Sequence, residues 1–174
     1  MPLTSTITDY DAEWPRLYRE EVERLTPVFE GTLIAIHHIG STAIPGLLAK
    51  PEIDMLAVVP SVDSADRWAV RLDRLGYTRG GDLSSGHLFF KRSLNGVRTH
   101  KLHVCRRQHF QIDSMLKFRD QLRTCDDLRR QYGLLKRKLE RENSEGIGEY
   151  LAGKAPFIRA VLASIEPAEG RTEP

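Results

Sequence analysis

Two short apolar runs joined by a turn-rich segment constrain this chain more than any other feature. Residues 33–39 form a run rich in β-branched side chains that ends at Gly40-Ser41. Residues 53–60 form the second run, which is apolar except for Asp54. Runs of this length and composition, bounded by glycine and proline, predict buried strands. We therefore expect a sheet in which two neighbouring segments of the chain supply core strands.

The rest of the chain alternates between helical and strand patterns. Apolar residues recur at three and four positions over Asp11–Glu30 and over Val62–Leu75, which predicts two amphipathic helices that end at glycine. Strands are predicted at His87–Arg92 and Thr99–Cys105, joined by a hairpin with the signal Leu94-Asn95-Gly96. Three helices follow, at Phe110–Leu122, Asp127–Glu142 and Ile147–Ile165. Pro156 either kinks the last helix or marks a late start.

This order of elements predicts the α+β class, with a small mixed β-sheet, helices packed on it and a helical C-terminal part. A length of 174 residues suits one domain, which we place at residues 1–165, with a frayed tail at 166–174. The net charge of +2 argues against a nucleic-acid coat protein. Two cysteines and the lack of a membrane-length apolar run favour a cytoplasmic protein with reduced thiols and no membrane association.

The chemistry should lie where the first strand ends and the second begins. Residues two apart in a strand point to the same face, so Glu52 and Asp54 should present adjacent carboxylates. Two such carboxylates repel unless a cation or a proton lies between them. Oxygen ligands favour Mg²⁺ or Mn²⁺, and Gly40 and Ser41 can approach and bind a phosphate group. The pattern indicates phosphoryl or nucleotidyl transfer, whereas a solvated strand edge is the structural alternative.

Gly-Ser followed by ten residues and an acid-x-acid pair resembles the signature of the nucleotidyltransferase superfamily related to DNA polymerase β. Within it the chain resembles the GrpB family, over roughly residues 7–160. The matching segments are residues 38–47 and 50–54, Tyr10-Asp11 with Trp14-Pro15, His100 with Leu102-His103-Val104, residues 116–123, Tyr132 with Leu135-Lys136, and Tyr150 with Lys154 and Phe157-Ile158. The resemblance implies a nucleotidyltransferase-like fold and a poorly defined activity. Some relatives are fused to dephospho-CoA kinases.

The resemblance also singles out two departures. Glu52 stands where such enzymes place their first aspartate, and the later strand that often carries a third acid offers His100 and His103 instead. Either histidine could serve as a general base, and His103 as a metal ligand, although histidines hydrogen-bonded within the sheet are the structural alternative. Positive charge for a triphosphate could come from Lys50, Lys136 and Lys154.

We therefore expect a nucleotidyltransferase, dependent on Mg²⁺ or Mn²⁺, that joins a nucleoside triphosphate to a small-molecule acceptor. Gly40 and Ser41 would bind phosphates, Glu52 and Asp54 the metal, and His103 or His100 would complete the catalytic set. The alternative is a nucleotide- or metabolite-binding module that keeps the fold without turnover, which the missing third carboxylate favours. A nucleic-acid partner is not expected.

Overall fold

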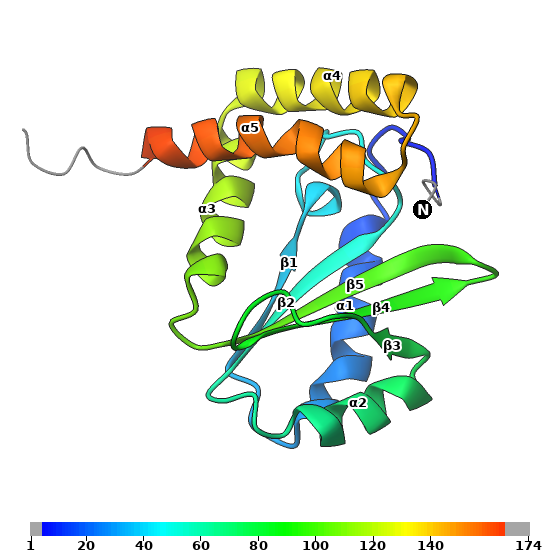
Figure 1. Ribbon diagram of the computed structural model, residues 1–174, viewed down its shortest axis with the longest axis vertical. Helices are drawn as coiled ribbons and strands as arrows, with labels where there is room; N and C mark the ends of the chain where they lie inside the picture. The colour runs from blue at the N-terminus through cyan, green and yellow to red at the C-terminus, as the bar shows by residue number, and fades with distance from the viewer. Residues whose placement is uncertain (1–4, 166–174) are drawn as a thin grey trace, which may run out of the picture.

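Five strands form one mixed sheet in the computed structural model, which describes residues 5–165 (Figure 1). The strands are β1 (Ala35–Ile39), β2 (Ile53–Val59), β3 (Tyr77–Arg79), β4 (His87–Leu94) and β5 (Val97–Arg106). Their order across the sheet is β1-β2-β5-β4-β3. The β2–β5 pair is parallel, and the other three pairs are antiparallel. The predicted tail at 166–174 lies outside the described residues.

The helices cover both faces of this sheet. They are α1 (Trp14–Leu25), α2 (Ala65–Arg74), α3 (Phe110–Thr124), α4 (Asp126–Glu142) and α5 (Ile147–Ile165), with short 3₁₀ segments η1 (Thr26–Phe29) and η2 (Ser41–Ala43). Helices α1 and α2 pack on one face, where Trp14 and Trp68 join Met55 and Phe90 in the main core cluster. Among residues 5–165, no helix is long and apolar enough to span a membrane.

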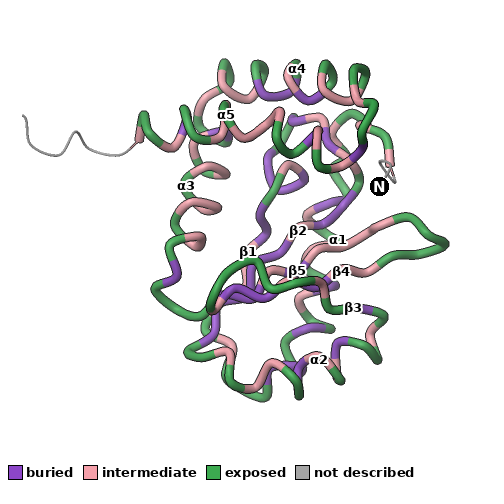
Figure 2. Tube along the Cα trace, viewed as in Figure 1, coloured by how far each residue is buried: buried purple, intermediate pink, exposed green. Residues whose placement is uncertain are grey.

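The C-terminal helices form a second hydrophobic core beside the other face of the sheet (Figures 1 and 2). Helix α3 packs on the sheet through Ile112 and Met115, against Leu56 and Val58. Helices α4 and α5 pack on α3, and the chain that follows η2 inserts Ile44 and Leu47 among them. The segment between β1 and β2 is thus held between the sheet and the C-terminal helices.

The α+β class and the mixed sheet are confirmed, with differences at the ends of elements. The first helix ends at Leu25 and continues as 3₁₀ because Pro27 has no N–H to donate. Strand β3 escaped sequence analysis because it has only three residues and pairs with β4 alone. Helix α5 begins at Ile147 and contains Pro156, so a late start is wrong.

Candidate functional site

Gly40 and Asp54 are packed against each other where β1 ends and β2 begins. Ile39 is the register partner of Asp54 in the antiparallel β1–β2 pair, and Gly40 follows at φ +69° before η2 starts. A Cβ at position 40 would lie 2.3 Å from Oδ2 of Asp54. Glycine is therefore required here twice, for its left-handed backbone and for its missing side chain. The strand-turn geometry predicted for the Gly-Ser segment is present, and it holds the Asp54 carboxylate in place.

Glu52 and Asp54 share a cation, which is the ammonium group of Lys101 on β5. Nζ of Lys101 lies 2.8 Å from Oε2 of Glu52 and 3.1 Å from Oδ1 of Asp54. Asp54 and Lys101 are register partners in the parallel β2–β5 pair, which explains why the three side chains meet. The sequence argument that two neighbouring carboxylates need a cation between them is satisfied by the chain itself.

The two carboxylates differ in how fully they are engaged. Oε1 of Glu52 accepts a hydrogen bond from Ser5 at 3.1 Å, and its Oε2 accepts from Nε of Arg98 at 2.9 Å. Burial raises the pKa of Glu52, but Lys101 and Arg98 outweigh burial and hold this pKa below its ordinary value. In contrast, Oδ1 of Asp54 is buried without a hydrogen bond, and its contact with Lys101 is an ion pair only.

This difference decides which carboxylate fits a divalent cation. Glu52 is 3% exposed and both its oxygens already have partners, so it does not fit a metal ligand as it stands. Asp54 fits, because one of its oxygens is buried and lacks a hydrogen bond. The arrangement can therefore hold one metal on Asp54, rather than a symmetric pair of carboxylate ligands.

Three predicted phosphate-binding lysines border the same carboxylates from different elements. Lys50 lies before β2, and its Nζ is 4.9 Å from the ring centroid of Tyr150 on α5. Lys154, one turn further along α5, has its Nζ 4.5 Å from the same ring. Lys136 on α4 is 2% exposed and donates a hydrogen bond to the carbonyl of Leu48.

The charges of these lysines are coupled to one another and to Asp54. Burial, together with Lys154, lowers the pKa of Lys136 to about 7, against the opposing effect of Asp54. Burial, Lys101 and Lys50 lower the pKa of Lys154 to about 8, which Asp54 and Glu52 oppose. Lysines that are this poorly solvated and repel one another gain free energy from an anion placed among them. The electrostatics favour a ligand carrying several negative charges.

Of the two predicted histidines, only His103 lies on the face of the sheet that carries the site. His100 is the register partner of Ile53 and belongs to the opposite face, where Nη2 of Arg92 lies 3.0 Å from its Nδ1 and Glu21 is nearby. His103 is on the same face as Lys101, but its Nδ1 lies 2.8 Å from Nε2 of His87. Neither histidine has a hydrogen bond to a carboxylate in the described part of the chain, and Nε2 of His100 is 3.9 Å from Glu21. Burial and Arg92 lower the pKa of His100 to about 4, so this ring is neutral near pH 7.

Sequence analysis missed three residues that organise the site. Lys101 and Arg98 neutralise Glu52. Lys101 lies in the predicted strand at Thr99–Cys105, so its charge was visible in the sequence, whereas Arg98 joins that strand only in the structure. Nothing in the sequence marks Thr42, because its role depends on the path that the backbone takes through the turn. Its Oγ1 donates to the carbonyl of Glu52 at 3.1 Å and lies 3.0 Å from Nε2 of His38.

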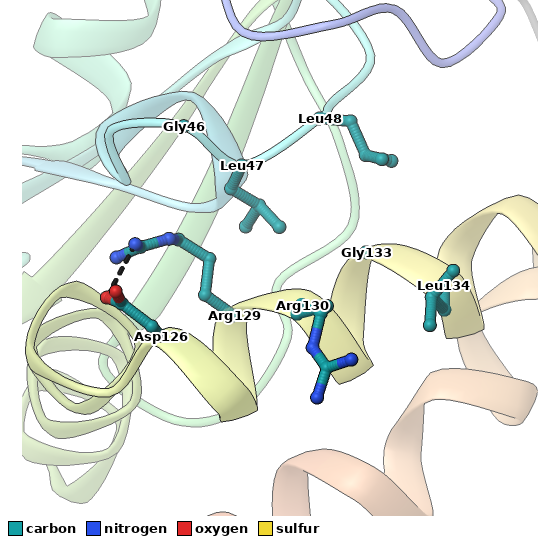
Figure 3. Close-up of a pocket in the computed structure, with 8 residues that line it drawn as sticks. All are labelled: Gly46, Leu47, Leu48, Asp126, Arg129, Arg130, Gly133 and Leu134. Carbon is teal, nitrogen blue, oxygen red and sulfur yellow. Dashed lines mark hydrogen bonds and ion pairs between the residues drawn. The ribbon is translucent and has the colours of Figure 1, made fainter.

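A separate hollow of about 300 Å³ lies on the outer side of the η2–β2 connection (Figure 3). Gly46, Leu47 and Leu48 form one wall, and the N-terminal half of α4 forms the other, with Arg129 paired to Asp126 at 2.6 Å. None of its lining residues is one of the predicted site residues. The hollow is therefore distinct from the site on β2 and β5.

The fold is nucleotidyltransferase-like. The protein is similar to Cid1, described as an RNA terminal uridylyl transferase, with a TM-score of 0.54 and 13% identity over 75% of this chain and 41% of that chain. A Cid1 poly(U) polymerase structure bound to MgATP gives a TM-score of 0.50 at 14% identity, covering 84% of this chain and 50% of that one. The chain belongs to the GrpB family, whose model, GrpB protein, matches residues 4–164.

The relatives with UPF0157 or GrpB names have names that give no activity. The UPF0157 protein YqkA of Bacillus subtilis is 37% identical over 86% of this chain, which spans only 44% of YqkA. The UPF0157 protein BH1888 of Halalkalibacterium halodurans is 35% identical over 90% of this chain and 80% of that protein. The crystal structure of GrpB from Enterococcus faecalis gives a TM-score of 0.85 at 30% identity, over 91% of this chain and 96% of that one. A dephospho-CoA kinase of Mycolicibacterium paratuberculosis is 28% identical over 86% of this chain and 43% of that enzyme.

Proposed function

We propose that this protein binds a nucleoside triphosphate at the site formed by Asp54, Lys101 and the three lysines 50, 136 and 154. The observation that carries the proposal is the convergence of Lys101 on β5, Lys136 on α4 and Lys154 on α5 on the partly buried carboxylate of Asp54, with Lys50 beside Glu52. Positive charges that are this close together and poorly solvated are stabilised by a multiply charged anion. A triphosphate has that charge and a length that can reach several elements.

Gly40 and Ser41 complete the phosphate-binding part of the site. The left-handed backbone of Gly40 and the absence of a side chain there let a ligand approach the η2 turn closely. Thr42 keeps this turn attached to β2 through the carbonyl of Glu52. These residues supply directional hydrogen-bond donors, whereas the lysines supply charge.

Asp54 is the residue that would hold a Mg²⁺ or Mn²⁺ ion arriving with the triphosphate. Such an ion neutralises charge on the phosphate oxygens and orients them. Lys101 would then be released from Asp54 toward the phosphates, while Arg98 continues to neutralise Glu52. Cid1, which shares the fold, has been solved with MgATP bound.

Nucleotidyl transfer to a small-molecule acceptor is the activity that this binding mode supports, by comparison with the superfamily. The second candidate is a nucleotide- or metabolite-binding module without turnover. Lys101 favours that candidate, because the residue opposite Asp54 on β5 is a cation and not a further carboxylate. The similarity to part of a dephospho-CoA kinase is compatible with both candidates, an enzyme and a binding module, and with a role in nucleotide or CoA metabolism.

The test is calorimetric titration of the full chain with nucleoside triphosphates and with the matching nucleosides, with and without Mn²⁺. We expect the triphosphates to bind in a metal-dependent manner and the nucleosides to bind far more weakly. Asp54→Asn should abolish the metal dependence while leaving the free energy of unfolding within about 1 kcal/mol, because Lys101 keeps its ion pair with Glu52. Asp66→Asn is the matched control, since the Asp66 side chain is 99% exposed on α2.

Pyrophosphate release with pooled metabolites as acceptors separates the two candidates. Release by the parent, lost in Asp54→Asn, would establish an enzyme. Metal-dependent binding without release for any acceptor would establish a binding module. If no triphosphate binds, or if Asp54→Asn binds metal and triphosphate as well as the parent does, the proposed site is wrong.

A further inference from the structure

A second cluster of metal-binding side chains lies at the far end of β5 from Lys101. His87, Cys105 and His109 each place a ring nitrogen or sulfur atom within 4.8 Å of the other two. They come from three elements, since His87 begins β4, Cys105 lies near the end of β5 and His109 is the N-cap of α3. Their exposed fractions are 2%, 0% and 7%. Burial of so many polar rings beside a thiol calls for a ligand or a hydrogen-bond network.

The strand register brings the first two side chains together. His87 and Cys105 are direct partners in the antiparallel β4–β5 pair, so both side chains project from the same face. The His109 ring lies across from His87, with centroids 5.4 Å apart. The cluster is therefore formed by regular backbone on two sides and by a helix start on the third, which are rigid supports for a metal site.

Only some of the possible metal-ligand atoms in this cluster have hydrogen-bond partners. Nε2 of His87 lies 2.8 Å from Nδ1 of His103, and in the tautomer in which His87 Nε2–H donates to His103, Nδ1 of His87 has a free lone pair. His109 accepts from the Gln111 N–H at 3.2 Å and lies 3.0 Å from Oγ of Ser84, so a metal would replace one of these two bonds. The sulfur of Cys105 has no hydrogen bond within residues 5–165.

We propose that His87, Cys105 and His109 bind a divalent transition metal of the zinc class. Two imidazoles and a thiolate are ligands that Zn²⁺ prefers, and the absence of a carboxylate from the cluster disfavours Mg²⁺ and Ca²⁺. Three protein ligands leave a fourth position of the tetrahedron open. Binding converts the Cys105 thiol to a thiolate, with release of one proton to solvent.

The position of this site indicates a structural role. A metal there would join β4 and β5 to the start of α3, the helix on which α4 and α5 pack. Those two helices carry Lys136 and Lys154 of the triphosphate site. The metal would thus stabilise the placement of the C-terminal helices against the sheet, without contributing to Asp54.

The test uses Co²⁺ as a spectroscopic substitute for Zn²⁺ on the full chain after treatment with a chelator. We expect one equivalent to bind, with the near-ultraviolet charge-transfer absorption of a thiolate ligand. At one hundred times the dissociation constant, the metal should raise the unfolding temperature by about 5–10 °C. Zn²⁺ should compete with Co²⁺ for the same site.

Four variants make the result specific. Cys105→Ser should lose the charge-transfer absorption, whereas Cys125→Ser, which changes the other free cysteine, should keep it. His109→Asn should weaken binding at least about tenfold while keeping a side-chain cap on α3, so a folded variant is assured even if Cys105→Ser unfolds. Asp54→Asn should leave the metal spectrum unchanged. Absence of stoichiometric binding, or binding that survives both Cys105→Ser and His109→Asn, would overturn the proposal.

Discussion

Lys101 lies opposite Asp54 in the parallel pairing of β2 with β5, and its Nζ is 3.1 Å from Oδ1 of that aspartate. Burial lowers the pKa of Lys101, but Asp54 and Glu52 outweigh burial and raise this pKa above its ordinary value. The ammonium group of Lys101 thus faces the Asp54 carboxylate from the neighbouring strand and is the partner that the chain itself supplies for it.

Removal of that ammonium group should destabilise the fold. We expect Lys101→Met to lower the free energy of unfolding by about 2–4 kcal/mol, because two largely buried carboxylates lose a shared partner. Urea unfolding at pH 7 measures the change. Lys91→Met is the matched control, since Lys91 is the register partner of Lys101 on β4 and has no ion pair among the described residues. Equal effects of the two substitutions would show that the shared ion pair does not stabilise the fold.

A methyl group at Gly40 should affect both stability and ligand binding. In Gly40→Ala the new Cβ meets the Asp54 carboxylate at 2.3 Å in a left-handed backbone, whereas at Gly31, with φ +79°, a Cβ meets nothing within 4 Å. We expect Gly31→Ala to cost about 1 kcal/mol and Gly40→Ala about 1–2 kcal/mol more. Thermal unfolding and triphosphate titration of both variants check this. Similar costs and unchanged binding would mean that the Gly40–Asp54 contact is not needed.

Triphosphate binding should weaken as the pH rises past neutrality. The pKa of Lys136 is lowered to about 7 by burial and by Lys154, so its ammonium form is present below pH 7 and is lost above it. Lys136→Arg keeps the charge at every pH and should flatten the profile between pH 6 and 7.5. Isothermal titration across this range measures the effect, with Lys138→Arg on the exposed side of α4 as control. A parent profile that is already flat would exclude Lys136 from ligand binding.

Acid should destabilise the fold through His38. Burial, Arg123 and Arg119 lower the pKa of His38 to about 4, against an ordinary value of 6.5. The unfolded chain therefore takes up a proton between pH 6.5 and 4 that the folded chain does not, and stability falls as pH falls. The expected loss is about 1.4 kcal/mol per pH unit in this window for one histidine. His38→Gln should remove that part of the slope in urea unfolding at pH 7, 5.5 and 4.5. An unchanged slope would assign the acid sensitivity to other groups.

The sequence by itself predicted all the helices and every strand except β3, and it placed Glu52 and Asp54 together. β-Branched runs predict β1 and β2, glycine predicts the turn after β1, and the two-residue period of a strand puts Glu52 and Asp54 on one face. These properties depend on local backbone geometry, which a short stretch of sequence contains. The same period separates His100 from His103, because residues three apart in a strand face opposite sides.

Only the tertiary structure decided which side chains meet those carboxylates. The parallel β2–β5 register selects Lys101 as the partner of Asp54 and assigns His100 to the opposite face. No local pattern specifies a register between strands this far apart in the sequence. The antiparallel β4–β5 register likewise selects the pairing of His87 with Cys105. Lys136 and Lys154 reach the site only because α4 and α5 pack beside the η2–β2 connection, where burial changes their pKa values. Long-range pairing and burial are properties of the whole fold, and here they determine the charge of the site.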